Sequence, residues 1–212
     1  MPGRSFGREP FRSGREAYTR RVEQRRRLGA ELTDAARADH APRIETQRLV
    51  LRGWRATDFE DYAAMSADPD VMRYIGGPID RAQCWRQMAI HAGHWVLRGY
   101  GNWAVEHRID GVLLGRVGVW NPEGWPGLEV GWKLARHAWG RGYAGEAAQA
   151  AMDWAWDTLD AEQLISVIHP DNAASIRVAE RLGLRPLRDD TVNGQQVIIF
   201  GIERPRDTGN PS

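Results

Sequence analysis

The chain has a single cysteine, Cys84, among its 212 residues, so it cannot form an internal disulfide. This is expected of a protein from a reducing compartment. No apolar run approaches the roughly 18 residues that a membrane span needs, and the N-terminus lacks the apolar core of a secretion signal. We therefore expect a cytoplasmic protein with no membrane partner.

Lysine is also nearly absent, because Lys133 is the only one. Residues 1–27 contain nine arginines and three glutamates, a charge of +6, which leaves −5 on the rest of a chain whose net charge is +1. Blocks of like charge are usually solvated. We interpret residues 1–42 as an Arg-rich extension, mobile or with a short helix. An arm that binds nucleic acid is the alternative.

The remaining residues have the texture of one compact domain, over 43–204, followed by a short tail at 205–212. Asp110-Gly111 and Asn193-Gly194 are hairpin turn signals. Strands are predicted over 48–52, 103–106, 115–120, 128–134, 164–168 and 196–202. Helices are predicted over 58–65, 80–95, 147–159 and 172–182. Their predicted caps are Thr57 or Asp58 for the first, Asp80 for the second, and Asp171 or Asn172 for the last.

A glycine-rich loop, Gly140-Arg-Gly-Tyr-Ala-Gly145, lies between the strand at 128–134 and the helix at 147–159. Glycines in such a place let the backbone approach a phosphate closely. The free N–H groups and the positive dipole end of the following helix then bind the anion. The sequence therefore predicts a phosphorylated cofactor at this loop.

The loop also satisfies the G-x-G-x-x-G pattern of dinucleotide-binding proteins. Residues 135–139, however, separate its first glycine from the strand, and only one βαβ unit is visible. These observations speak against a dinucleotide-dependent oxidoreductase. A P-loop is excluded, because no Gly-Lys-Ser/Thr follows.

Over residues 43–203 the chain resembles the GCN5-related N-acetyltransferase (GNAT) superfamily, and within it the branch that acetylates ribosomal-protein N-termini. The motifs that carry the resemblance are Thr46-Gln-Arg-Leu-Val-Leu-Arg52 with the helix after it, Glu129-Val-Gly-Trp132, Gly140-Arg-Gly-Tyr-Ala-Gly-Glu-Ala147 and Asn172-Ala-Ala-Ser175 with Ile-Arg-Val-Ala-Glu-Arg-Leu-Gly183. The resemblance implies an α/β (α+β) fold, with a mixed sheet of six or seven strands flanked by helices.

The resemblance further implies acetyl-coenzyme A as co-substrate, with no metal. A parallel strand pair would splay around it, and a backbone N–H would polarise the acetyl carbonyl. Its pyrophosphate would bind the backbone of Arg141, Gly142, Tyr143, Ala144 and Gly145, and its pantetheine arm would pair with Trp132 and Leu134. Trp139 stands where the superfamily often has Gln or Arg.

Amine acetylation benefits from a general base, because only a neutral amine attacks. We predict Glu129 as this base, with Gly131 and Lys133 on the same face of its strand. Glu106 and His107 are reserve candidates, and His169 is interpreted as a packed residue beside a helix.

The departing thiolate benefits from a proton donor. The superfamily often has a tyrosine at the position of Ala179 here. Ser175, as in the ribosomal-protein branch, is the substitute candidate, as an acid or as a group that positions the thiol. Asn172, one helical turn earlier, is a helix cap, a cofactor contact or both.

The acceptor is expected to be a primary amine, either a peptide N-terminus or a small molecule, and the −5 body favours a cationic one. Two other functions stay open: a non-catalytic acyl-coenzyme A sensor, and a nucleic-acid-binding protein that uses residues 1–42. The sequence leaves the oligomeric state open, a homodimer included.

Overall fold

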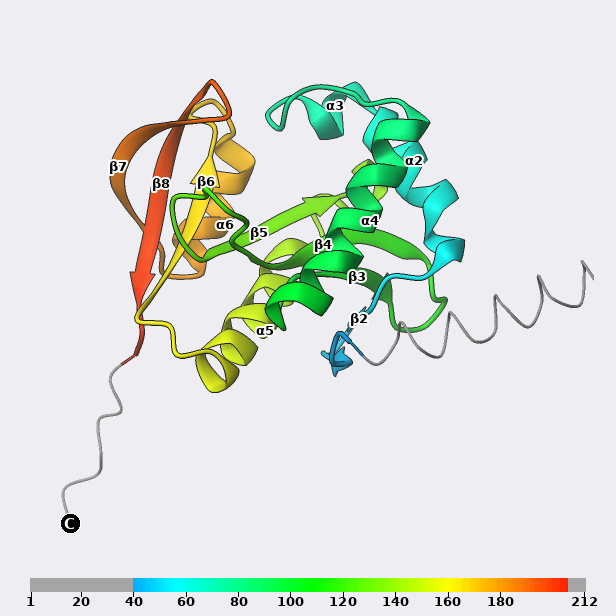
Figure 1. Cartoon of the computed structure of the whole chain (residues 1–212), viewed down its shortest axis with the longest axis horizontal. Helices are drawn as coiled ribbons and strands as arrows, with labels where there is room; N and C mark the ends of the chain where they lie inside the picture. Colours follow the sequence, from blue (N-terminus) through cyan, green and yellow to red (C-terminus); the bar gives the residue numbers. More distant parts are fainter. Residues whose placement is uncertain (1–39, 206–212) are drawn as a thin grey trace, which may run out of the picture. The chain divides into compact units, whose positions relative to one another are not determined.

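The computed structural model describes residues 40–205, so most of the predicted extension and tail lies outside the described residues. Its centre is one eight-stranded sheet with the strand order β1-β2-β3-β4-β5-β6-β8-β7 (Figure 1). The strands are β1 (Ile44–Glu45), β2 (Leu49–Arg52), β3 (Asn102–His107), β4 (Leu113–Trp120), β5 (Glu129–Leu134), β6 (Gln163–Ile168), β7 (Arg185–Val192) and β8 (Gln195–Glu203).

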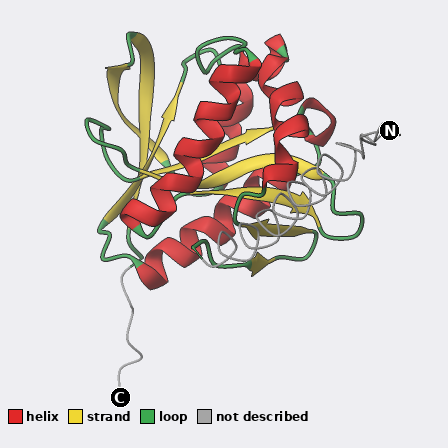
Figure 2. Ribbon diagram, turned by 45° about the vertical axis from the view of Figure 1, so that its right-hand side comes forward, coloured by secondary structure: helices red, strands yellow, loops and turns green. Residues whose placement is uncertain are grey.

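Helices cover both faces of this sheet (Figure 2). On one face α5 packs its alanine-rich side on Val117 and Val130, whereas on the other face α2 and α4 cover Ala104 and Leu113. The helices are η1 (Ala56–Asp58), α2 (Phe59–Ala67), α3 (Pro69–Met72), α4 (Arg81–Arg98), η2 (Arg136–Ala138), α5 (Tyr143–Thr158) and α6 (Ala173–Arg181).

The predicted α/β class is confirmed, and the sheet has one strand more than the upper expected number. Two strands lie outside the predicted ranges: β1 has two residues and is too short to give an alternation signal, and β7 was implied only by the Asn193-Gly194 hairpin turn. Two of the predicted caps also occur, whereas Asp58 makes no side-chain cap bond at the start of α2. The Asp80 carboxylate accepts the Gln83 N–H at the start of α4, and the Asn172 side chain accepts the Ser175 N–H at the start of α6.

The parallel pair β5 and β6 is splayed, as predicted. These strands pair at a single register position, Glu129 opposite Ile165, where the Ile165 N–H donates to the Leu128 carbonyl at 2.9 Å. One residue further the Ser166 hydroxyl bonds the Val130 carbonyl at 2.6 Å. The two backbones then diverge, whereas each keeps a full ladder with its other neighbour.

Glu146 joins the start of α5 to the segment between β1 and β2. Its carboxylate accepts hydrogen bonds from the Thr46 hydroxyl and from the backbone and side chain of Arg48. Burial opposes the charge, but these bonds outweigh it, so the pKa of Glu146 lies below its ordinary value. The loop before α5 therefore has a fixed position relative to β2.

A buried ion-pair network joins β2, β3 and η1. Arg52, 6% exposed, makes two hydrogen bonds of 2.8 Å to Asp58 and one of 2.6 Å to Glu106. Asp58, 4% exposed, also accepts the Arg55 N–H. This network fixes the start of α2 on the sheet.

Replacing Asp58 tests the network. We expect Asp58→Asn to lower the free energy of unfolding by about 3 kcal/mol, because it leaves the buried Arg52 guanidinium without its bidentate partner. Chemical denaturation measures this change. Asp61→Asn, at an exposed position of the next helix, α2, is the matched control and should stay within about 0.5 kcal/mol of the parent. Equal effects of the two substitutions would contradict the assignment.

Candidate active site

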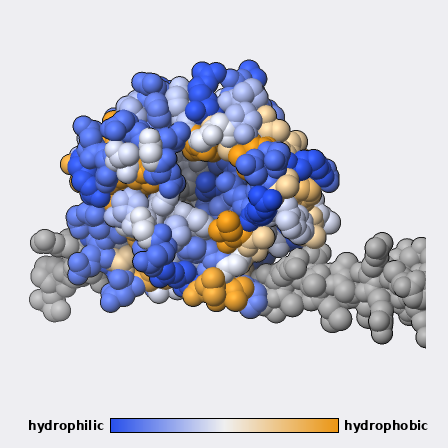
Figure 3. All heavy atoms as spheres, turned by 45° about the horizontal axis from the view of Figure 1, so that its top comes forward, coloured by the Kyte–Doolittle hydropathy of each residue, from blue (hydrophilic) through white to orange (hydrophobic). Residues whose placement is uncertain are grey.

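A cavity of about 810 Å³ opens where β5 and β6 separate. Figure 3 shows the molecular surface hollowed in this region. The walls come from α3 and the chain after it, from β4 and β5, from η2 and the loop after it, and from the start of α5, β6 and α6. Most of the predicted cofactor residues line it, namely Trp132, Leu134, Gly142, Tyr143, Ala144, Gly145, Asn172 and Ser175, together with the predicted base Glu129.

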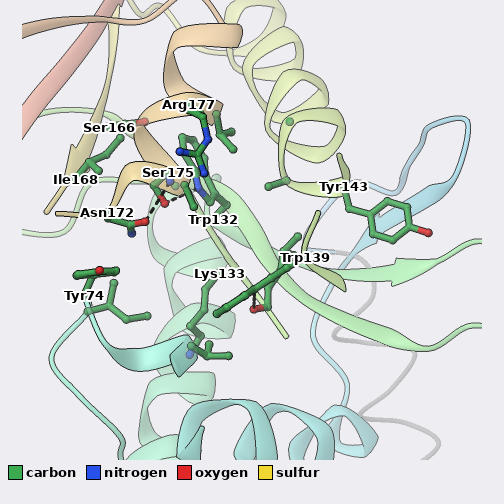
Figure 4. Close-up of a pocket in the computed structure, with 18 of the residues that line it drawn as sticks. Tyr74, Trp132, Lys133, Trp139, Tyr143, Ser166, Ile168, Asn172, Ser175 and Arg177 are labelled. Atoms are coloured by element: carbon green, nitrogen blue, oxygen red, sulfur yellow. Dashed lines mark hydrogen bonds between the residues drawn. The ribbon is translucent and has the colours of Figure 1, made fainter. Parts of the chain in front are cut away.

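The glycine-rich loop forms one end of the cavity. Gly142 is the N-cap of α5 and has φ +80°, a left-handed conformation that favours glycine. The first turn of α5 therefore presents its backbone to the cavity, while the Tyr143 ring lies away from it, 4.7 Å from the Arg48 guanidinium (Figure 4). Arg141 is not a lining residue, and its carbonyl accepts a hydrogen bond from Arg48.

The edge of β5 that faces the gap has unusual hydrogen bonding. The Ala135 N–H bonds the Leu114 carbonyl of β4, so by antiparallel alternation the backbone groups of Trp132 and Leu134 point toward β6. The Leu134 carbonyl accepts the Trp139 indole N–H at 2.9 Å. Both backbone groups of Trp132 and the Leu134 N–H therefore face the space between the separated strands.

Ser175 and Asn172 stand across this space, at the start of α6 (Figure 4). The Trp132 indole N–H donates to the Ser175 hydroxyl at 3.2 Å, which leaves the hydroxyl proton able to donate elsewhere. Ala179 is fully buried in the core. The departure from the family pattern at this position therefore places a small apolar side chain in the core.

Glu129 lies at the point where the strands separate. Its carboxylate accepts the Trp125 indole N–H at 2.8 Å and lies 3.4 Å from the Val167 nitrogen. Burial raises the pKa of Glu129 to about 7, against the opposing effects of the Arg116 charge and these two donors. A carboxyl group with this pKa changes protonation state near neutral pH, as a general base requires.

Gly131 and Lys133 share the face of Glu129, as the alternation predicted. A Cβ atom on Gly131 would lie 3.2 Å from the Glu129 Oε1 atom, so the glycine keeps the space above the carboxylate open. Lys133 runs toward the helical side of the cavity (Figure 4). Its ammonium group donates to Ser66 of α2 at 3.0 Å and to Gln87 of α4 at 3.2 Å.

The reserve bases were wrong. Glu106 belongs to the Arg52 ion-pair network, and His107 bonds Asp110 within the β3–β4 hairpin at 2.9 Å. Neither residue lines the cavity. His169 does line it, with its ring 5.1 Å from that of Tyr74, and its Nδ1 atom accepts the Asp171 N–H.

Several cationic side chains in the cavity wall were not identified from the sequence. They are Arg73, Arg116, Arg136, Arg177 and Arg181. Arg177 and Arg181 lie one turn apart on α6, a spacing that could have indicated a shared face. Arg136 instead pairs with Asp70 at 2.7 Å. The cavity wall is therefore rich in positive charge, which suits an anionic cofactor.

Comparison with known proteins places this architecture. The sequence pattern of the acetyltransferase (GNAT) domain matches residues 48–185. YkkB of Bacillus subtilis (strain 168) is 34% identical over 150 residues, which cover 67% of this chain and 84% of YkkB. An N-acetyltransferase of the same organism, YnaD, is 26% identical over 146 residues, covering 67% and 82%.

Solved structures give the same result. An acetyltransferase from Agrobacterium tumefaciens str. C58 has a TM-score of 0.69 and 33% identity, covering 76% of this chain and 94% of that one. RimL, a ribosomal L7/L12 α-N-protein acetyltransferase in complex with coenzyme A, has a TM-score of 0.65 and 16% identity, covering 76% and 98%. The second likeness concerns the fold alone, so the ribosomal-protein branch stays a prediction.

Within residues 40–205 no helix combines the length and the apolar character that crossing a membrane requires. The glycine loop at the start of α5, the separated strands and the matches in sequence and structure all agree. The chain therefore belongs to the GCN5-related N-acetyltransferase family, whose members are acetyltransferases that use acetyl-coenzyme A.

Proposed function

We propose that this acetyltransferase transfers the acetyl group of acetyl-coenzyme A to a primary amine, by direct attack in a ternary complex. The supporting observation is the single point of pairing between β5 and β6. It opens one continuous cavity between the glycine-rich loop and Glu129. The co-substrate supplies an activated thioester, and the side chains of this chain supply binding, orientation and proton transfer.

The cofactor end of the proposal is based on backbone groups. The N–H groups of Tyr143, Ala144 and Gly145 are in the first turn of α5, where they lack intrahelical acceptors and can bind a pyrophosphate. Arg177 and Arg181 add guanidinium groups on the opposite wall. Along β5, Trp132 and Leu134 offer a strand edge to the amide groups of the pantetheine arm.

The reaction end depends on Glu129 and Ser175. Glu129 removes a proton from the acceptor ammonium group, directly or through a water molecule, so that the amine attacks as the neutral species. A backbone N–H of β5 at Trp132 or Leu134 stabilises the oxyanion. The Ser175 hydroxyl donates a hydrogen bond to the departing thiolate, which with a pKa near 8.5 needs little further assistance.

The acceptor is proposed to be a protein N-terminal α-amine or a small-molecule amine. The acyl-coenzyme A sensor is disfavoured, because relatives such as YnaD and the structural neighbours reported above are named acetyltransferases. The nucleic-acid hypothesis depends on residues 1–42, of which residues 1–39 lie outside the described part of the chain.

Calorimetric titration with acetyl-coenzyme A, using NAD as the control ligand, tests the cofactor assignment. Binding of acetyl-coenzyme A alone is expected, followed by thiol release in the presence of a reactive amine. Absence of binding would refute the proposed function.

Gly142 provides a test of the phosphate end. Gly142→Ala adds a side chain at φ +80°, with its Cβ atom 3.4 Å from Arg48. We expect it to weaken acetyl-coenzyme A binding about tenfold or more, a change of at least about 1.4 kcal/mol. Gly194→Ala, at φ +75° in the β7–β8 turn, introduces similar backbone strain far from the loop and should leave the dissociation constant unchanged. Equal losses of affinity would argue against the loop as the phosphate site.

Glu129 provides a test of the base. Because the base acts when ionised, kcat/KM of the parent enzyme should rise with pH through about 7, the pKa of Glu129, and then level off. Glu129→Gln keeps one oxygen, which can accept from Trp125 or from Val167 but not from both, and it removes the base, so kcat/KM should fall about 10²- to 10⁴-fold. Unchanged acetyl-coenzyme A binding would show that the site remains folded. Glu162→Gln, at an exposed position, is the matched control, and a loss of the same size there would contradict the role of Glu129.

A further inference from the structure

Two basic side chains lie directly opposite each other in the cavity. Arg116 of β4 and Lys133 of β5 are cross-strand partners in the antiparallel register, so both side chains project from the same face of the sheet. Both line the cavity, on the face of β5 that also carries Glu129. Like charges directly opposite each other destabilise a sheet unless something compensates them.

The described residues supply neither side chain with an ion pair. Lys133 is 4% exposed, and its ammonium group contacts only neutral groups: the oxygens of Ser66 and Gln87, the Met72 sulfur and the Tyr62 ring, 4.2 Å away. Arg116 donates from Nη1 to the Asn102 side chain at 2.9 Å. Its Nε atom is buried and has no hydrogen-bond partner within residues 40–205.

The acidic groups of the same cavity are already engaged. Asp70 pairs with Arg73 at 2.6 Å and with Arg136 at 2.7 Å. Glu129 accepts from Trp125 and Val167, and its raised pKa shows that the Arg116 charge does not offset its burial. The cavity therefore has positive charge in excess at Arg116 and Lys133.

This positive charge lowers the pKa values of neighbouring basic groups. Burial, and next the charge of Arg116, lower the pKa of Lys133 to about 7. His91 of α4 packs beside Trp120 of β4, and burial, Arg116, Lys133 and His94 keep its pKa well below the ordinary value. In both groups burial is the largest cause, and the neighbouring positive charge of Arg116 adds to it. Leaving buried charges without a counter-charge is costly.

We propose that the acceptor is a primary amine that itself carries an acidic group, a carboxylate or a phosphate, which pairs with Arg116 and Lys133. This inference rests on the proposed function, because it places the amine of the same molecule at Glu129. Gly131 lies between Glu129 and Lys133 on the strand and has no side chain. It therefore leaves space for the segment of the acceptor that joins the amine to the acidic group. The acidic group supplies the counter-charge that Arg116 lacks.

The experiment uses the full chain saturated with coenzyme A, so that the phosphate-binding end is filled. Matched pairs of amines are titrated by calorimetry: α- and ω-amino acids against their amides, and amino-sugar phosphates against the unphosphorylated sugars. The acidic member of at least one pair should bind about tenfold tighter or better than its neutral twin. At pH 8 its binding should also take up a proton, measured in two buffers of different ionisation enthalpy, because a bound anion raises the pKa of Lys133.

Substitutions locate the effect. Arg116→Gln should abolish the preference for the acidic twin, whereas Arg116→Lys should retain part of it. Arg86→Gln, an exposed arginine of α4, is the matched control and should keep the full preference. If Arg116→Gln does not fold, Lys133→Met should reduce the preference and remove the proton uptake.

The outcomes separate the two proposals. Equal binding of the twins, no binding of any acidic amine, or a preference that survives Arg116→Gln would refute the inference about the acceptor. If the protein still binds acetyl-coenzyme A in any of these cases, the proposed function stands. If it does not bind acetyl-coenzyme A at all, both proposals fail.

Discussion

The hydrogen bonding at the junction of β5 and β6 is the constraint on which the rest of the site depends. Backbone pairing between β5 and β6 ends after Ile165. Side chains then bond the backbone N–H and C=O groups nearest this point. The Ser166 hydroxyl bonds the Val130 carbonyl, and the Glu129 carboxylate lies within reach of the Val167 N–H. An unpaired strand edge in a protein interior would be costly. These two side chains therefore let the strands separate while satisfying the backbone groups nearest the junction.

The same junction explains why Glu129 has an unusual environment. The Glu129 carboxylate bonds the next strand at this point, where it is partly enclosed between the two sheet halves, and this burial raises its pKa. The chain then continues along β5 through η2 to the glycine loop, so one strand connects the candidate base with the candidate phosphate site. Glu146 fixes the far end of this path through Arg48 and Thr46. Both ends of the cavity are thus held by hydrogen bonds to other parts of the sheet.

Local signals in the sequence predicted the features that depend on near neighbours. The Asp80 and Asn172 caps, the turn glycines, and the shared face of Glu129, Gly131 and Lys133 follow from short spacings, and the structure confirms them. Family resemblance supplied the splayed strands. The prediction of Glu106 as a reserve base was wrong because that residue pairs with Arg52, which is 54 residues away in sequence. Pairing at that separation leaves no periodic trace, and the same limit hid the Val167 N–H, 38 residues from Glu129.

The net charge of residues 28–212 and the charges inside the cavity favour different acceptors. Residues 28–212 carry −5, which favours a cationic acceptor if the charge is averaged over the surface. Exposed charges, however, are screened within a Debye length of about 8 Å at physiological salt, whereas buried ones are screened much less. A bound acceptor therefore responds mainly to Arg116, Lys133 and Glu129, not to the distant surface. Because Arg116 and Lys133 have no carboxylate partner among the described residues, the local field at the floor of the cavity favours a molecule that brings one negative charge with its amine.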